Sequence, residues 1–475
     1  MKSIIFLAVL FCALDLSISG CQVPNTQDSQ KPNIIFIMAD DHAAQAISCY
    51  GSQMNSTPNI DRIASEGAWF ENCFCTNSIC SPSRAAILTG KYSHLNGVRD
   101  NVEKFNGLQN TYPKYLRNAG YQTAVAGKWH LKSQPTGFDY WNVLPGQGEY
   151  HNPVLIENGV EKKHPGYVTD IITDIALDWL KERDREKPFC LMIHHKAVHA
   201  NWEADDKYAN MFSDINIPEP ATFYDDFEGR SPQLANHQLF VGPSQWGLHY
   251  EYRFGEMPVE GSIQDRKEWM YQRYIKDYLR CVASVDENIG RVLAYLDETG
   301  LDKNTIIIYT SDQGFFLGEH GLYDKRFMYE ESLRLPLLIR YPKEIKPATH
   351  VEKMVLNLDF AETILDYAGV EIPEDMQGKS FRQLAKGQSP EGWRDGMYYR
   401  FYEEAYGIGP CEGIRTQQYK LIHYLYGDEF WELYDLKNDP HEMENLYTDI
   451  TYKNTIEVLK NEMSELRLQY KFGEE

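Results

Sequence analysis

Two short apolar runs, at residues 34–38 and 305–309, each lead into a pair of side chains with hard oxygen donors. The four side chains are Asp40, Asp41, Asp312 and Gln313. Carboxylate and amide oxygens are the ligands that Ca²⁺ and Mg²⁺ prefer in proteins. One Asp-Asp pair after a strand is more often a helix cap or a loop feature. A second pair after a second strand, however, predicts a site for a hard divalent cation.

The sharpest local motif is Cys80-Ser81-Pro82-Ser83-Arg84, followed by Thr89-Gly90. Pro82 and Ser83 predict the start of a helix. Residue 80 then lies at or just before a helix N-terminus, whose positive end favours an anion such as sulfate. Arg84 by itself would be an ordinary arginine on a helix surface. Beside residue 80, it is a candidate clamp on the nucleophile and on metal-bound oxygens.

Four more basic side chains are candidates for the same site: Lys128, His130, His199 and Lys325. Lys128 and His130 alternate along an extended stretch and therefore point to one side. The residues alone also fit a surface Lys-His pair at 128 and 130 and an exposed Asp-Lys-Arg cluster at 324–326. His194 and His195, close to His199, fit core or supporting histidines. Residue types and spacing leave these alternatives open.

Taken together, the motifs resemble the type I sulfatases, the formylglycine-dependent enzymes of the alkaline-phosphatase-like superfamily. The string from Cys80 to Arg84 resembles the first sulfatase signature, and residues 120–130 resemble the second. The resemblance covers residues 32–440 and implies that a maturation enzyme oxidises Cys80 to formylglycine. It implies five metal ligands: Asp40, Asp41, Cys80 in its oxidised form, Asp312 and Gln313. It also implies six catalytic residues: Cys80, Arg84, Lys128, His130, His199 and Lys325.

The resemblance further implies sulfate-ester hydrolysis through a covalent sulfo-enzyme. A hydroxyl of hydrated formylglycine attacks sulfur in line, while the cation, Ca²⁺ or Mg²⁺, and Arg84 stabilise the nucleophile. Lys128, His199 and Lys325 neutralise the sulfate oxygens and assist the leaving alcohol, and His130 then accepts a proton so that sulfate departs. A thiolate is an odd partner for a hard cation, whereas an aldehyde hydrate supplies a hard oxygen.

A loop rich in glycine and aromatic residues, at 137–153, resembles the N-acetylglucosamine-6-sulfatase branch, which acts on heparan or keratan sulfate fragments. Aromatic side chains stack on sugars, although the loop could equally serve packing. The expected substrate is a sulfated oligosaccharide, with 6-O-sulfated N-acetylglucosamine of glycosaminoglycan fragments favoured. Two alternatives stay open: a phosphonate monoester hydrolase or phosphodiesterase of the same superfamily, and a catalytically inactive glycan-binding lipoprotein.

The elements that must position these residues alternate between strands and helices. Strands are expected at 34–38, 123–125, 189–193, 305–309 and 336–339, and helices at 59–66, 83–88, 169–182 and near 265–296. This alternation predicts an α/β fold with a mostly parallel sheet flanked by helices. The candidate site then lies beyond the carboxyl ends of the strands.

A change in composition near residue 388 predicts two domains after the N-terminal segment. Residues 32–388 are expected to form the catalytic domain, and residues 389–475, with short aromatic-rich runs and a terminal helix near 454–469, a smaller α+β subdomain. Residues 201–264 show little periodicity and predict a long irregular excursion that borders the site.

The N-terminus resembles a bacterial lipoprotein signal. Lys2 precedes an apolar run at 4–14, which is too short to span a bilayer, and Ile18-Ser19-Gly20-Cys21 follows. We expect a signal peptide at 1–21, an acylated Cys21, a tether at 22–31 and a lipid-anchored protein in the periplasm. The alternative is an ordinary secretory signal with a chance cysteine.

Composition limits the partners. The 475 residues carry a net charge of −22, which argues against a general nucleic-acid or anionic-membrane surface. Membrane contact is therefore expected through the lipid alone, and an anionic substrate needs a local basic pocket. The nine cysteines include no C-x-x-C pair, so neither a disulfide framework nor a zinc ribbon is indicated.

Overall fold

The computed structural model describes residues 31–242 and 261–473. The expected signal peptide and residues 22–30 of the tether lie outside the described residues. The described residues from Pro32 onward form one compact unit. Among the described helices, none combines the length and the apolar character that crossing a bilayer requires.

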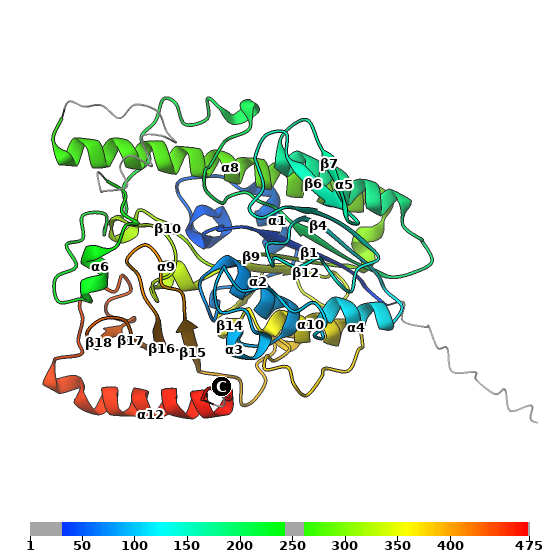
Figure 1. Cartoon of the computed structure of the whole chain (residues 1–475). Coiled ribbons are helices and arrows are strands. Elements are labelled where there is room, and N and C mark those ends of the chain that lie inside the picture. The colour runs from blue at the N-terminus through cyan, green and yellow to red at the C-terminus, as the bar shows by residue number, and fades with distance from the viewer. Residues whose placement is uncertain (1–30, 243–260, 474–475) are drawn as a thin grey trace, which may run out of the picture. The chain divides into compact units, whose positions relative to one another are not determined.

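A ten-stranded sheet lies at the centre of the unit (Figure 1). Its strands, in spatial order, are β13 (Thr349–Val351), β2 (Ala68–Phe70), β12 (Leu337–Arg340), β9 (Thr305–Ser311), β1 (Asn33–Ala39), β8 (Phe189–His194), β4 (Gln122–Lys128), β5 (Tyr140–Leu144), β6 (Val154–Glu157) and β7 (Val160–Lys163). The five strands from β9 to β5 are mutually parallel, whereas β12, β6 and β7 are antiparallel to their neighbours. The predicted mostly parallel sheet is thus confirmed at its centre.

Strand β1 shows why this centre must be covered on both faces. Ile35 and Ile37 point into one hydrophobic core, and Ile34 and Phe36 point into another, because successive side chains of a strand face opposite sides. A continuous apolar run of this kind is typical of a parallel strand between two helical layers.

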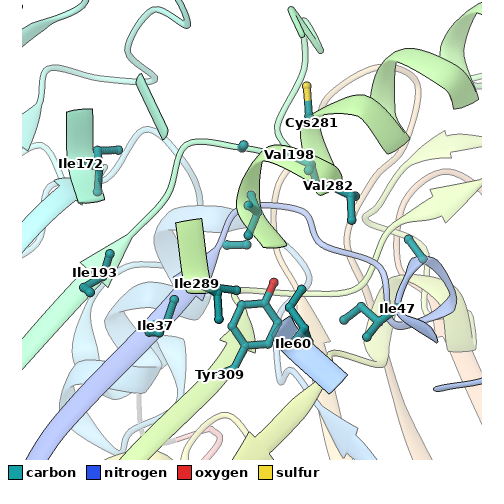
Figure 2. Close-up of a cluster of buried hydrophobic side chains, with 14 of the residues drawn as sticks. Ile37, Ile47, Ile60, Ile172, Ile193, Val198, Cys281, Val282, Ile289 and Tyr309 are labelled. Atoms are coloured by element: carbon teal, nitrogen blue, oxygen red, sulfur yellow. The ribbon is translucent and has the colours of Figure 1, made fainter. Parts of the chain in front are cut away.

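Helices supply the two layers (Figure 1). On one face lie α1 (Pro58–Ser65), α5 (Val168–Glu182) and α8 (Ile263–Thr299), and on the other lie α2 (Cys80–Thr89), α4 (Tyr112–Asn118) and α10 (Asp359–Tyr367). Figure 2 shows the first core, where Ile37 and Tyr309 of the sheet meet Ile60 of α1 and Ile289 of α8. Burial of each such side chain stabilises the fold by about 1.5–3 kcal/mol, an upper estimate.

Helix α8 has clear start and stop signals. Ser262 and Asp265 form a reciprocal capping box at its N-terminus, and Gly300 ends it at φ +69°, a left-handed conformation that glycine adopts without strain. The helix begins at Ile263, two residues before the predicted start near residue 265. The rest of the excursion from residue 201 is irregular apart from a short 3₁₀ turn and α6 (Pro232–Asn236), with residues 243–260 outside the described part.

The predicted C-terminal α+β structure consists of a four-stranded antiparallel sheet and a long helix. These elements are β15 (Gly396–Phe401), β16 (Cys411–Thr416), β17 (Tyr419–Tyr424), β18 (Phe430–Asp435) and α12 (Lys453–Gln469). Their apolar side chains share a third core with Ile79 and Ala86 of the α2 region. The short elements are β3 (Cys73–Phe74), β10 (Phe316–Leu317), β11 (Tyr323–Asp324), β14 (Val355–Leu356), α3 (Ser93–Asn96), α9 (Glu330–Leu333) and α11 (Arg382–Ala385).

Candidate active site

The two acidic pairs meet because their strands are parallel neighbours. Residues Ala39 of β1 and Ser311 of β9 pair in register, so Asp40, Asp41 and Asp312 emerge at the same edge of the sheet. Carboxylate oxygens of the three aspartates lie within 4.8 Å of one another, and all three side chains are buried. The Asp41 backbone N–H donates to Asp312 Oδ1 at 3.1 Å, which fixes the two loops together.

Helix α2 brings Cys80 and Arg84 to this edge. Cys80 is its first residue and is buried, and Arg84 lies one turn further along the same helix face. The Arg84 guanidinium donates through Nε to Asp312 Oδ2 at 3.0 Å and through Nη1 to the Lys128 carbonyl at 2.5 Å. Its Nη2 lies 3.4 Å from Asp40 Oδ1.

Strand β4 supplies Lys128 and, just beyond its end, His130. The Lys128 ammonium contacts Asp40 Oδ2. Ser81 Oγ donates to the His130 carbonyl at 2.6 Å and lies 3.5 Å from His130 Nδ1, so the residue after Cys80 holds this histidine. Gly127 has φ +103°, and a Cβ there would lie 2.0 Å from the His194 carbonyl oxygen, so only glycine permits β4 and β8 to approach this closely.

Loops after β8 and β11 complete the cluster. His199 Nε2 lies 3.8 Å from Asp41 Oδ2, and Lys325 Nζ donates to the two Asp41 carboxylate oxygens at 2.6 and 2.7 Å. His194, an alternative to His199 in the sequence, turns its Nδ1 toward the Lys128 carbonyl at 3.2 Å. The structure thus brings every candidate from the sequence into one cluster, in which His130 and His199 are half-buried and the other side chains are buried.

Burial and neighbouring charges set the protonation states. Burial raises the pKa of Asp312 to about 7 and that of Asp41 to about 6, with the charge of Asp40 adding to both. Burial acts against ionisation of Asp40 as well, but the charges of Lys128 and Arg84 hold its pKa well below the usual range. Burial, aided by Lys128, lowers the pKa of His130 to about 2 and that of His199 well below 6.5, so both rings are neutral near pH 7.

The donor set fits a hard divalent cation. Three carboxylates share one buried site, and the Gln313 amide oxygen there has no hydrogen-bond donor among the described residues. Burial raises the pKa of the Cys80 thiol, so the unmodified side chain is protonated and a poor ligand for such a cation.

The stretch at 137–153, expected as a loop, contains strand β5 (Tyr140–Leu144) of the central sheet, and residues on either side of this strand contact the cluster. Phe138 packs edge-on against Trp129, with ring centroids 5.9 Å apart, and the Tyr150 hydroxyl donates to the His199 carbonyl at 2.5 Å. This stretch therefore supports the segments that carry His130 and His199.

One supporting residue was missed from the sequence. The Tyr278 hydroxyl of α8 donates to the Asp41 carbonyl at 2.7 Å and accepts from the Ala43 N–H at 2.8 Å. In the sequence Tyr278 lies on the same apolar helix face as Tyr271 and Tyr274, and no local signal separates it from them.

Comparisons with known proteins agree with this arrangement. The family described as "Sulfatase" matches residues 32–370, and that described as "N-sulphoglucosamine sulphohydrolase, C-terminal" matches residues 318–469. The chain is 45% identical to an N-acetylglucosamine-6-O-sulfatase of Bacteroides thetaiotaomicron, over 96% of this chain and 90% of that protein. It is 28% identical to the human N-acetylglucosamine-6-sulfatase, over 88% and 81% of the two chains.

Among solved structures, BT4656 in complex with its substrate D-glucosamine-2-N,6-O-disulfate matches with a TM-score of 0.88 and 45% identity, over 94% of this chain and 99% of that chain. The phosphonate monoester hydrolase of Agrobacterium radiobacter matches with a TM-score of 0.73 at 22% identity, which shows a shared fold alone.

Proposed function

Because the chain belongs to the sulfatase family, and so is a sulfate-ester hydrolase, we propose that it removes the 6-O-sulfate from N-acetylglucosamine or glucosamine units of glycosaminoglycan fragments. The support for this substrate is the 45% identity, over nearly the whole of both chains, to a relative named for that activity. The observation that carries the chemistry is the convergence of Cys80, at the N-terminus of α2, with three cationic side chains (Arg84, Lys128 and Lys325) and three buried carboxylates.

Sulfatases generally use a formylglycine and a divalent cation, which together supply a nucleophilic hydroxyl and the positive charge that favours its ionisation. We assign the formylglycine to residue 80. The cation, Ca²⁺ or Mg²⁺, we assign to Asp40, Asp41, Asp312, the Gln313 amide oxygen and residue 80 itself. Arg84 holds Asp40 and Asp312 in place and adds positive charge beside residue 80.

The basic side chains stabilise the negative charge that develops during hydrolysis and transfer the protons. The Lys128 ammonium is paired with Asp40, and the Lys325 ammonium is paired with Asp41. Both ammonium groups stabilise the charge that develops on the sulfate oxygens. His199 Nδ1 lies 2.7 Å from the Ala200 carbonyl, so its proton is on Nδ1 and Nε2 faces the carboxylates. A bound sulfate raises the pKa of this ring, which then holds the proton that the leaving alcohol requires. His130 accepts a proton from the residue-80 side chain.

The test is sulfate release by matured enzyme from a panel of sugars. N-acetylglucosamine-6-sulfate and glucosamine-2-N,6-O-disulfate should be hydrolysed, with 6-sulfated galactosamine as the matched epimer and phosphonate and phosphate monoesters as the comparison at phosphorus. Preference for another sulfated position overturns the substrate, and faster turnover of phosphonates overturns the ester class. Glycan binding without release supports the binding-protein alternative.

We also propose that the protein is exported to the periplasm and anchored by acylation of Cys21, on the strength of Lys2, the apolar run at 4–14 and the small residues before Cys21. In its own host, the wild-type protein should fractionate with membranes and the Cys21→Ser variant should not be lipidated. Equal membrane association of the two contradicts the anchor.

A further inference from the structure

A second set of metal-binding side chains shares two residues, Asp40 and residue 80, with the proposed hard-cation set. A carboxylate oxygen of Asp40, the Cys80 sulfur and a ring nitrogen of His199 all lie within 4.8 Å of one another. This set contains one hard, one borderline and one soft donor, and thiolate with imidazole is typical of protein zinc sites.

His199 is already oriented as zinc-binding histidines are. A carbonyl oxygen only accepts hydrogen bonds, so the 2.7 Å contact between Nδ1 and the Ala200 carbonyl places the ring proton on Nδ1. The Nε2 lone pair is therefore directed at the carboxylates. A second hydrogen bond of this kind fixes tautomer and ring direction in metal sites.

The Cys80 side chain is buried and makes only a weak hydrogen-bond contact. Within the described residues, its one hydrogen-bond contact is from Gln313 Nε2, at 3.9 Å. The sulfur lies at the N-terminus of the ten-residue helix α2, and its thiol stays protonated until a metal ion displaces the proton.

The local charges also accommodate such an ion. Arg84, Lys128 and Lys325 form ion pairs with the three carboxylates, so basic and acidic side chains balance one another. A divalent ion together with a thiolate adds a single positive charge to this balance.

We propose that the chain with an unmodified Cys80 binds Zn²⁺ through Asp40, Cys80 and His199, with a fourth position open to water. Zinc binding displaces the thiol proton to solvent, forms the Zn–S bond and involves no change of oxidation state. Oxidation of Cys80 to the aldehyde removes the sulfur, so maturation eliminates this site and leaves the hard-oxygen set. Zinc binding by the cysteine form does not depend on the proposed hydrolysis.

The experiment uses the full chain from a host without a formylglycine-generating enzyme, with the intact Cys80 confirmed by peptide mass. After chelation, the protein is titrated with Co²⁺ and then Zn²⁺. One Co²⁺ per chain should bind with a thiolate-to-cobalt charge-transfer band, and Zn²⁺ should displace it. Cys80→Ser should abolish the band, and both Cys80→Ser and His199→Gln should weaken zinc binding by at least about 10-fold, since loss of a group that only orients a ligand already costs about 10–100-fold.

Cys411→Ser is the matched control, because Cys411 is another buried thiol and lies in β16, in the C-terminal sheet. It should keep both band and affinity. Calcium-dependent thermal stabilisation of each variant establishes that it is folded. A band that survives Cys80→Ser, a band lost in Cys411→Ser, or a folded cysteine form that binds Ca²⁺ but not Zn²⁺ overturns the proposal.

Discussion

At the scale of single residues, Arg84 joins three segments that are distant in the sequence. Its guanidinium contacts Asp312 after β9, Asp40 after β1 and the Lys128 carbonyl at the end of β4. A buried guanidinium is stable only with such partners. Because Arg84 lies one helical turn after Cys80, these contacts hold Cys80 and α2 against the loops that carry Asp40 and Asp312.

Arg84→Lys should lower kcat/KM by about 10²–10³ because a lysine keeps the charge but loses the planar fork of donors. Sulfate release from N-acetylglucosamine-6-sulfate measures this effect. Arg117→Lys is the control, since Arg117 forms an exposed ion pair with Asp139 and its replacement should leave the rate unchanged. Wild-type kcat/KM in Arg84→Lys would contradict the role assigned to the fork.

A second prediction at the scale of single residues concerns His237 and the pH dependence of protein stability. Its Nδ1 accepts the Leu239 N–H at 2.8 Å, and burial lowers its pKa from 6.5 to about 3. The unfolded chain binds a proton below pH 6.5 that the folded chain does not. The stabilisation by neutral His237 is therefore complete above pH 6.5 and decreases toward pH 3, by up to about 1.4 kcal/mol per pH unit.

The measurement compares urea unfolding of wild type and His237→Asn at pH 7 and pH 5. The stability advantage of the wild type should shrink by about 2 kcal/mol at the lower pH. A difference between the two proteins that stays constant with pH contradicts the burial of a neutral ring.

At the scale of elements, the long helix α8 positions the loop after β1. Asp41 adopts φ +60°, which is uncommon for a residue other than glycine, and the Tyr278 hydroxyl bonds to the two backbone groups that flank the next residue, the Asp41 carbonyl and the Ala43 N–H. The core beneath, with Val282 and Ile289, fixes α8 against the sheet (Figure 2). Helix packing thereby sets the position of a carboxylate.

Tyr278→Phe should weaken divalent-cation affinity and lower the free energy of unfolding by about 1–3 kcal/mol, because two buried backbone groups lose their partner. Calorimetric titration with Ca²⁺ measures the affinity independently of activity. Tyr274→Phe is the matched variant one turn away; its hydroxyl donates to the Phe316 carbonyl, so it should cost stability without changing the affinity. Equal affinity losses in both variants would argue for a general effect of helix packing.

At the scale of the whole molecule, the C-terminal sheet forms part of the support of the site. The Tyr399 hydroxyl donates to the Arg326 carbonyl at 3.1 Å and accepts from the Ser78 N–H at 3.3 Å, so one side chain of β15 ties the segments next to Lys325 and Cys80. Arg415 and Lys420 form buried ion pairs with Glu330 of α9. The sheet is therefore packed into the unit by both apolar and ionic contacts.

A chain of residues 32–388, which ends at the predicted domain boundary, should not fold to a soluble protein, whereas residues 32–475 should. Truncation exposes the apolar side chains that pack against β15 and β16 and leaves Glu330 without two of its buried partners. Soluble yield and cooperative thermal unfolding of the two chains provide the comparison. A cooperatively unfolding 32–388 chain would establish the boundary as that of an independent domain.

The sequence by itself determined the strand-helix alternation and the candidate residues that the structure brings together. Buried parallel strands are continuous apolar runs, and their carboxyl ends carry the polar residues, so the apolar pattern alone locates Asp40 and Asp312. Lys128, His199 and Lys325 needed the sulfatase resemblance as well, because their spacing alone equally fits surface residues.

Only the tertiary structure decided which supporting side chains reach the site. The roles of Tyr278 and Tyr399 depend on where α8 and the C-terminal sheet pack, hundreds of residues from their partners. The proximity of Asp40, Cys80 and His199 arises in the same way, because two loops and the start of α2 meet at one edge of the sheet. Local sequence encodes the type and the face of each residue, whereas distances across elements depend on packing of the complete core.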